Sequence, residues 1–150
     1  PGSCIHVVMW GVVKNELEMK TQHRLFVNLR YEGIMLRNTR GMYESGKRSA
    51  DLQKYKEFFD MEFPVRYVRE DANGNAMLGV YDALAEAEFE TSYGDFDERK
   101  RQLREPHTVI GKALTVKFQT RYKDSRLPQF PTGLGFRDGV WVGENFVPVN

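Results

Sequence analysis

A carboxylate and two lysines in the first half of the chain have the types and the spacing for work on a polyphosphate. Glu32 precedes the apolar run Ile34–Leu36, and Lys54 and Lys56 follow further along. A carboxylate at the end of a strand can hold Mg²⁺ or position an attacking group. Lysines at i and i+2 of a strand share a face, where two ammonium groups can stabilise a leaving pyrophosphate. Taken alone, each residue is more typical of solvated surface charge.

A basic segment in the second half suits a different task. Lys117, Gln119 and Arg121 alternate along an expected strand, which places them on one face. Positive charge is enough for non-specific contact with the phosphates of duplex DNA, because such contact does not require reading the bases. The alternative interpretation of this segment is an ordinary exposed strand face. From residue 112 to 126 five basic residues oppose a single acidic one: Lys112, Lys117, Arg121, Lys123 and Arg126.

Composition limits the class of protein. The chain has 150 residues, 41% hydrophobic and 29% charged, which is typical of one globular domain or a small domain with an extension. No apolar run approaches the ~18 residues that a membrane span needs. Cys4 is the only cysteine, so no intrachain disulfide forms and a reducing compartment is expected. The Pro-Gly-Ser start does not read as a signal peptide, so we expect a cytoplasmic or nuclear protein that is not secreted.

The elements that must position Glu32 and the lysines follow from local patterns. Ile5–Val13 is β-branched and aromatic and predicts a buried strand. Asn15, with Glu18 three residues later, predicts the start of a helix that should end near Tyr31 or Gly33. Ile34–Leu36 predicts a second buried strand, after which residues 38–47 form a loop.

The second half predicts a small barrel. Asn73-Gly74 is a strong hairpin signal, and Asp95 with Glu98 begins a helix that Pro106 ends. Three strands, a helix and two strands is the order of an OB barrel. The domain boundary should lie between residues 58 and 63. The expected strands are Phe63–Tyr67, Met77–Leu84, Ala87–Tyr93, Leu114–Thr120 and Gln129–Phe136.

Six segments, read in order, resemble a known family. They are YEGIMLRN, SGKRS, LQKYK, IGKALTVKFQ, DSRLPQFP and GFRDG. Their order and spacing over about residues 24–139 resemble the C-terminal portion of an ATP-dependent DNA ligase of phage or viral type. The resemblance implies an α+β chain. Residues 1–60 would be the end of a nucleotidyltransferase (ATP-grasp-like) adenylation domain, and residues 61–150 a five-stranded OB-fold β-barrel with one helix between strands 3 and 4.

The resemblance also implies roles in the first half. Glu32 would be the catalytic metal ligand near the adenylate, and Lys54 and Lys56 would contact the nucleotide phosphates. Arg37 and Arg48 would lie beside the nucleotide or the nick. The implied cofactors are ATP, held as AMP during the reaction, and Mg²⁺, and the implied partner is nicked double-stranded DNA.

In the second half the match covers the family's last motif. Arg137 and Asp138 would lie over ATP and orient pyrophosphate during self-adenylation. Gly139 departs from the pattern where a lysine is often found, and Gln129 departs where an arginine would be. The basic residues from Lys112 to Arg126 would grip the DNA.

One family motif is missing. The chain contains no K-x-D-G, whose lysine takes AMP in the family, so we expect that the chain alone cannot adenylate itself. A second polypeptide, or an N-terminal half, would have to supply that lysine. Two alternatives stay open: a non-catalytic OB module that binds nucleic acid, and an RNA ligase or mRNA-capping relative. The DSRLPQFP segment before FRD favours a DNA ligase over the latter.

Overall fold

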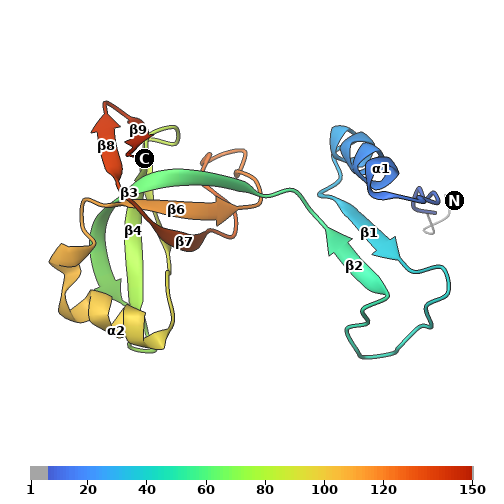
Figure 1. Cartoon of the computed structure of the whole chain (residues 1–150), viewed down its shortest axis with the longest axis horizontal. Helices are drawn as coiled ribbons and strands as arrows, with labels where there is room; N and C mark the ends of the chain where they lie inside the picture. The colour runs from blue at the N-terminus through green and yellow to red at the C-terminus, as the bar shows by residue number, and fades with distance from the viewer. Residues whose placement is uncertain (1–6, 150) are drawn as a thin grey trace, which may run out of the picture. The chain divides into compact units, whose positions relative to one another are not determined.

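The computed structural model describes residues 7–149, which form two compact units that divide between Glu57 and Phe58 (Figure 1). Strand β3 (Phe59–Glu70) begins the second unit, so residues 60 and 61, where the sequence placed the boundary, belong to one strand. None of the described helices is long and apolar enough to cross a membrane.

The first unit contains helix α1 (Glu16–Asn28) and the antiparallel strands β1 (Ile34–Arg37) and β2 (Leu52–Tyr55). The predicted helix start is confirmed, because the Asn15 side chain accepts a hydrogen bond from the Glu18 amide at 2.9 Å. The helix ends at Asn28, a few residues before the expected end. β1 confirms the strand predicted over 34–36, although its residues are alternately half-buried and exposed.

The buried strand predicted over Ile5–Val13 is wrong for the residues that the structure describes. Residues 7–14 have no regular secondary structure, and the Trp10 side chain is 81% exposed. Ile5 and His6 lie outside the described residues. The composition favours a strand, but a strand needs a neighbour for its backbone hydrogen bonds, and β1 and β2 pair only with each other within 7–57.

The second unit confirms the predicted OB fold. Strands β3, β4 (Ala76–Asp82) and β5 (Ala87–Thr91) are followed by helix α2 (Phe96–Arg104), a short 3-10 turn (Pro106–Thr108), β6 (Ala113–Phe118) and β7 (Thr132–Arg137). The five strands pair antiparallel with their neighbours, in the sheet order β5-β4-β3-β6-β7. The Gly133 amide of β7 donates to the Ser92 carbonyl just after β5 at 3.0 Å, which links the two outer strands. The helix lies between the third and fourth of these strands, as predicted.

Local signals set the turns of this barrel. The Asn73-Gly74 hairpin is confirmed: the Asp71 amide donates to the Asn75 carbonyl at 2.8 Å, and Gly74 has a φ of 75°, which suits glycine. Asp95 caps α2 by accepting from the Glu98 amide at 2.9 Å. The core is formed by apolar side chains from all five strands or the adjoining turn: Phe63, Val65, Leu78, Val80, Phe89, Val109, Leu114, Val116 and Phe118, with Phe136 of β7 packed against them.

A hairpin that the sequence analysis did not predict follows the barrel. It consists of β8 (Gly139–Val142) and β9 (Asn145–Pro148), in which Trp141 pairs with Phe146 and their ring centroids lie 5.1 Å apart. A Cβ on Gly139 would come within 2.3 Å of the Phe146 ring. The hairpin therefore explains why glycine occupies the position where the ligase pattern often has a lysine. In Figure 1 this hairpin and α2 lie at opposite ends of the barrel.

Candidate functional site

The pairing of β1 with β2 decides which side chains share a face. Met35 lies opposite Lys54, and Arg37 lies opposite Leu52. Because side chains alternate along a strand, Arg37 and Lys54 lie on the same face of this two-stranded sheet. The other face carries Tyr55, whose ring meets His23 of α1 edge to face at 4.9 Å. Helix α1 thus packs on the face that lacks these cations.

A hollow of about 680 Å³ in the first unit gathers several of the predicted residues. Arg37, Arg48 and Lys54, three of the four predicted nucleotide-binding residues, line it. Lys56 is not part of this lining. Lys47 is, although the sequence analysis placed it only in a loop; its signal was its position beside Arg48 in the same GKRS segment. Four cations line the hollow against the two carboxylates of Glu44 and Asp51, and this excess of positive charge suits a nucleotide with its phosphates.

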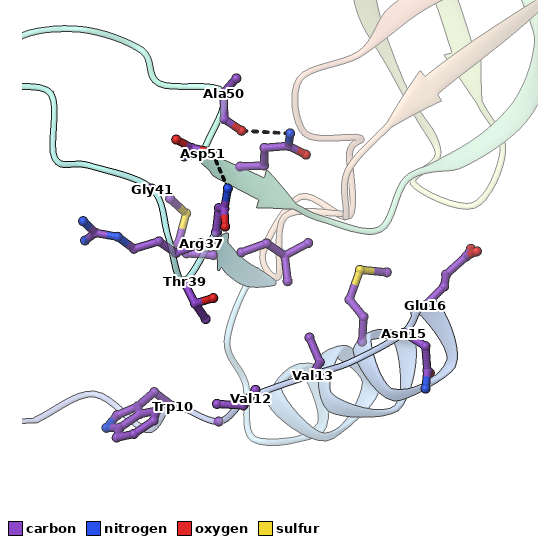
Figure 2. Close-up of a pocket in the computed structure, with 16 residues that line it drawn as sticks. Trp10, Val12, Val13, Asn15, Glu16, Arg37, Thr39, Gly41, Ala50 and Asp51 are labelled. Carbon is purple, nitrogen blue, oxygen red and sulfur yellow. Dashed lines mark hydrogen bonds between the residues drawn. The ribbon is translucent and has the colours of Figure 1, made fainter.

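The loop that supplies Lys47 and Arg48 is closed at its base. The Asn38 amide donates to the Asp51 carbonyl at 2.8 Å, and the Asn38 side chain donates to the Asp51 carboxylate, also at 2.8 Å. The Gln53 side chain donates to the Ala50 carbonyl at 3.0 Å. Figure 2 shows the two side-chain hydrogen bonds beside a second hollow, of about 900 Å³, which lies between this loop base and the Trp10–Val13 segment. These hydrogen bonds hold the two ends of the loop together, and the loop carries Lys47 and Arg48.

Glu32 and Lys56 form an ion pair in which Lys56 Nζ lies 2.6 Å from Glu32 Oε2. The Glu32 side chain is 74% exposed, and exposed pairs contribute little to stability. Among residues 7–149 no group of three or more His, Cys, Asp or Glu side chains is arranged to hold a metal ion. A single carboxylate fits Mg²⁺, which commonly keeps several waters and takes phosphate oxygens as its other ligands. The structure thus brings the predicted metal ligand next to one of the predicted phosphate contacts.

Gly33 lies just before β1, against Tyr55 and Lys56 at the end of β2. A Cβ at this position would be 2.4 Å from the Tyr55 carbonyl oxygen, closer than two such atoms can come. Glycine therefore lets the chain after Glu32 pass against the end of β2, where Lys54 and Lys56 project. A Glu-Gly dipeptide is uninformative by itself, but here the nearby Tyr55 carbonyl explains why glycine follows Glu32.

Arg137 and Asp138 lie at the end of β7 in the second unit. The Arg137 guanidinium donates to Glu62 of β3 at 3.2 Å, and the Asp138 backbone carbonyl accepts from the Val149 amide at 3.1 Å. Both side chains are exposed. Arg137 is therefore held on the barrel surface by an exposed ion pair, which a stronger anion could replace.

The predicted DNA-binding residues do not form the single face that was expected. Strand β6 ends at Phe118, and Gln119 turns inward to 9% exposure, so the prediction that Lys117, Gln119 and Arg121 share an exposed face is wrong. Lys117 Nζ lies 4.4 Å from the centre of the Phe58 ring, and Lys112 Nζ lies 5.9 Å from that of Phe136. Both keep a charged group at the surface beside an aromatic ring.

The remaining three residues of the DNA-binding set lie on the segment between β6 and β7. Lys123 and Arg126 are exposed on a turn, in agreement with the turn predicted over 123–126. Arg121 differs, because its side chain is only 19% exposed and its guanidinium bonds to the buried carboxylate of Asp82.

Comparison with known proteins identifies relatives. In an alignment of 155 positions, gaps included, the chain is 30% identical to the DNA ligase of African swine fever virus (isolate Pretoriuskop). The alignment covers 93% of this chain and 37% of the viral enzyme. The ligase of the Malawi isolate is 31% identical over 158 residues, with the same coverage. The chain is related to the C-terminal portion of viral DNA ligases. It spans little more than a third of the length of these relatives. No family model matches the chain.

Solved structures agree with this relationship to the ligases. One, described as a structure–function analysis of Lig E DNA ligases that bind DNA with a minimal scaffold, superposes with a TM-score of 0.68 at 25% identity. That match covers 85% of this chain and 48% of the other. The adenylate form of Chlorella virus DNA ligase has the same fold, with a TM-score of 0.51 at 22% identity over 85% of this chain and 49% of that one. The predicted ligase resemblance and OB fold are confirmed.

Proposed function

We propose that this chain carries the phosphate-binding and metal-binding half of an ATP-dependent DNA ligase active site, together with its DNA-binding OB domain. Such a ligase seals nicks, as DNA replication and repair require, through an adenylate intermediate. The observation that carries the proposal is the hollow that gathers Arg37, Arg48 and Lys54 in a relative of DNA ligases.

The residues of the first unit would act on the triphosphate of ATP. Lys54 and Arg37, on the same face, would bind phosphate oxygens and stabilise the charge that develops on leaving pyrophosphate. Arg48 would approach from the loop. Glu32 would hold Mg²⁺, which when bound neutralises phosphate charge. Lys56, now bonded to Glu32, would turn to the phosphate once the metal takes the carboxylate.

The residues of the second unit would hold nicked duplex DNA. Lys112, Lys117, Lys123 and Arg126 all present charge at the surface, which suits sequence-independent contact with phosphates. Arg137 and Asp138 would serve the adenylation step, with Arg137 exchanging Glu62 for a phosphate.

The lysine that takes AMP would come from elsewhere. Two features of the first unit support a second polypeptide or an N-terminal half that carries K-x-D-G. Its sheet has only two strands covered by one helix, and His23 is the only buried residue among those described in this unit. Its Val7–Val13 segment exposes large apolar side chains that an additional part could cover.

A nick-sealing assay tests the proposal. The chain is combined with a polypeptide that supplies a K-x-D-G adenylation segment, and sealing of a nicked duplex is measured with ATP and Mg²⁺. Removing one donor aimed at developing charge costs roughly 10²–10³-fold in rate, so Lys54→Ala should lower sealing by about that factor. Lys14→Ala removes an exposed lysine outside the hollow and should leave the rate unchanged. Equal sealing by wild type and Lys54→Ala would overturn the proposal.

A non-catalytic nucleic-acid-binding module is the second candidate, and the self-contained core of the second unit favours it. In that case nicked duplex would bind equally well to wild type and to the Glu32→Ala and Lys54→Ala variants, and no added segment would produce sealing. An RNA ligase or capping relative would instead show a preference for RNA ends or for GTP in the same assay.

A further inference from the structure

The segment between β6 and β7 that carries Lys123 and Arg126 is built around one arginine. Arg121 forms an isolated bridge with Pro128 across the segment. Its guanidinium Nη1 donates to the Asp82 carboxylate and, at 2.8 Å, to the Arg126 backbone carbonyl. The same side chain lies over the Phe118 ring, with Cζ 5.2 Å from the ring centre. Arg121 thus connects the barrel to the far end of the turn.

The acceptor on the barrel side is buried. The Asp82 side chain, at the end of β4, is 2% exposed, and Arg121 is its ion-pair partner. Asp82 also accepts from the Leu84 amide at 3.0 Å and from the Ala85 amide at 3.4 Å. A buried carboxylate needs such partners. If the guanidinium moved away to bind a DNA phosphate, Asp82 would remain in the core as an uncompensated charge.

The turn itself depends on the position of Arg121. The Tyr122 amide donates to the Leu127 carbonyl at 2.9 Å, and the Arg126 amide donates to the Tyr122 carbonyl at 3.0 Å. Arg126 has a φ of 59°, a left-handed conformation that costs a residue with a Cβ. The bond from Arg121 to the Arg126 carbonyl holds this strained residue in place.

We infer that Arg121 is a positioning residue: anchored on Asp82, it shapes the turn that presents Lys123 and Arg126 to DNA and does not itself neutralise a phosphate. This inference rests on the proposed DNA-binding function of the second unit. It reverses the role that the sequence pattern suggested for Arg121.

The two roles predict opposite effects of a change at Asp82. If charge alone matters, Asp82→Asn removes a negative charge and binding of DNA strengthens. If Asp82 anchors the turn, the same substitution loosens Arg121 and binding weakens, although Asp82 is buried and cannot touch DNA. The sign of the change therefore separates the two roles.

The experiment measures binding of the full chain to a short nicked duplex over a range of salt concentrations, for Asp82→Asn, Arg121→Gln and the double variant. Contacts that share one function are non-additive, so each single variant should weaken binding by about 3- to 10-fold and the double variant by less than about twofold more. In Arg121→Gln the loosened turn still brings Lys123 and Arg126 to phosphates but must be ordered on binding, so the slope of log K against log salt should stay unchanged. Lys123→Ala and Arg126→Ala should each reduce that slope by about 0.9.

Controls separate positioning from loss of the fold. The double variant replaces the ion pair with a neutral Asn–Gln pair, so no unpaired charge is left in the core, and its thermal unfolding is compared with wild type. Arg69→Gln breaks another arginine–carboxylate pair of the same barrel, with Glu90, and should leave DNA binding and its salt slope unchanged apart from the screened effect of one charge.

The outcomes are distinct. A salt slope lowered by about 0.9 in Arg121→Gln, or DNA binding that is unchanged or tighter in Asp82→Asn, overturns the inference. If the wild-type chain binds no DNA, the proposed function fails, and hydrogen exchange of the Tyr122 and Arg126 amides still decides the structural role. Faster exchange of both amides in Asp82→Asn supports the anchor, and unchanged exchange overturns it.

Discussion

The two units of this chain differ in how they bury apolar surface. Every buried apolar side chain within residues 7–149 belongs to the second unit, where nine of them form one cluster. Of the described residues in the first unit only His23 is buried. The second unit is a complete barrel, whereas the first holds charged residues on a two-stranded sheet with little core behind it. The proposed half-site therefore lies on the unit with the smaller buried core.

The largest expected contrast is in stability. Leu114 is fully buried in β6, and replacing such a leucine by alanine typically costs 2–5 kcal/mol, so Leu114→Ala should lower the free energy of unfolding by about that amount. Leu52→Ala in β2, which is exposed, should change it by less than about 0.5 kcal/mol. Urea unfolding measures both in a Trp10→Phe background, where Trp141 is the remaining tryptophan and its fluorescence follows the second unit. Equal losses in the two variants would mean that the units share one core.

Gly33 tests whether the first unit depends on backbone approach. Gly33→Ala should push β2 away and displace Lys54 and Lys56, because its Cβ would meet the Tyr55 carbonyl. A misplacement of about 1 Å can cost roughly 10²-fold in rate, and sealing in the reconstituted assay should fall by about that factor. The thermal transition of the second unit should not move. Gly11→Ala, at a glycine that has open space around it and no positive φ, is the control for an added methyl group in the same unit.

The two helix caps give a smaller contrast. Asp95 and Asn15 both accept a hydrogen bond from the amide three residues ahead. Losing such a cap costs about 1 kcal/mol, so Asp95→Ala should destabilise the barrel by that amount, since α2 packs on β3 and β4. Asn15→Ala should instead reduce only the helical circular dichroism signal of α1. A shift of the barrel transition by Asn15→Ala would contradict the independence of the units.

Acid should affect the second unit more than the first, and this is the smallest effect. Arg69 lowers the pKa of Glu90, and Arg101 lowers that of Glu98, each below the ordinary 4.5. A carboxyl whose pKa is lower in the folded state stabilises the fold above its unfolded value, and that stability is lost as pH falls. The barrel should therefore weaken below about pH 4.5.

Glu90→Gln tests this acid dependence. The variant should be less stable than wild type at pH 7 and should lose less stability between pH 5 and pH 3. Glu16→Gln removes an exposed carboxylate of α1 whose pKa is lowered by the hydrogen bond from Lys20, and it should leave the curve of the barrel unchanged. Parallel curves for wild type and Glu90→Gln would show that the Arg69 pair does not contribute.

Features that depend on neighbouring residues could be predicted from the sequence, whereas features that depend on tertiary contacts could not. The caps at Asn15 and Asp95 and the turn at Asn73-Gly74 depend on neighbouring residues, and each was predicted correctly. The strand over residues 5–13 was wrong, because β-branched composition does not supply a pairing partner. Gln119 was misplaced since nothing in the alternation shows that β6 ends at Phe118. The β8–β9 hairpin was missed, although Gly143 between two alternating runs was a usable turn signal.

The site shows the same division. The EGIMLR and KYK segments identified Arg37 and Lys54, because motif order is a property of the sequence. The anchoring of Arg121 on Asp82 joins residues 39 positions apart and needed the folded barrel. Lys47 stood beside a predicted residue, but only the closed loop between Asn38 and Asp51 brings it to the hollow.

Transfer of AMP from radiolabelled ATP in the presence of Mg²⁺ is the measurement that decides whether this chain carries only half of the active site. No covalent protein–AMP should form on this chain alone, and the added K-x-D-G polypeptide should become labelled when the two are combined. That labelling should fall with Lys54→Ala. A labelled band on this chain by itself would contradict the claim that it holds the phosphates and the metal but does not take the AMP.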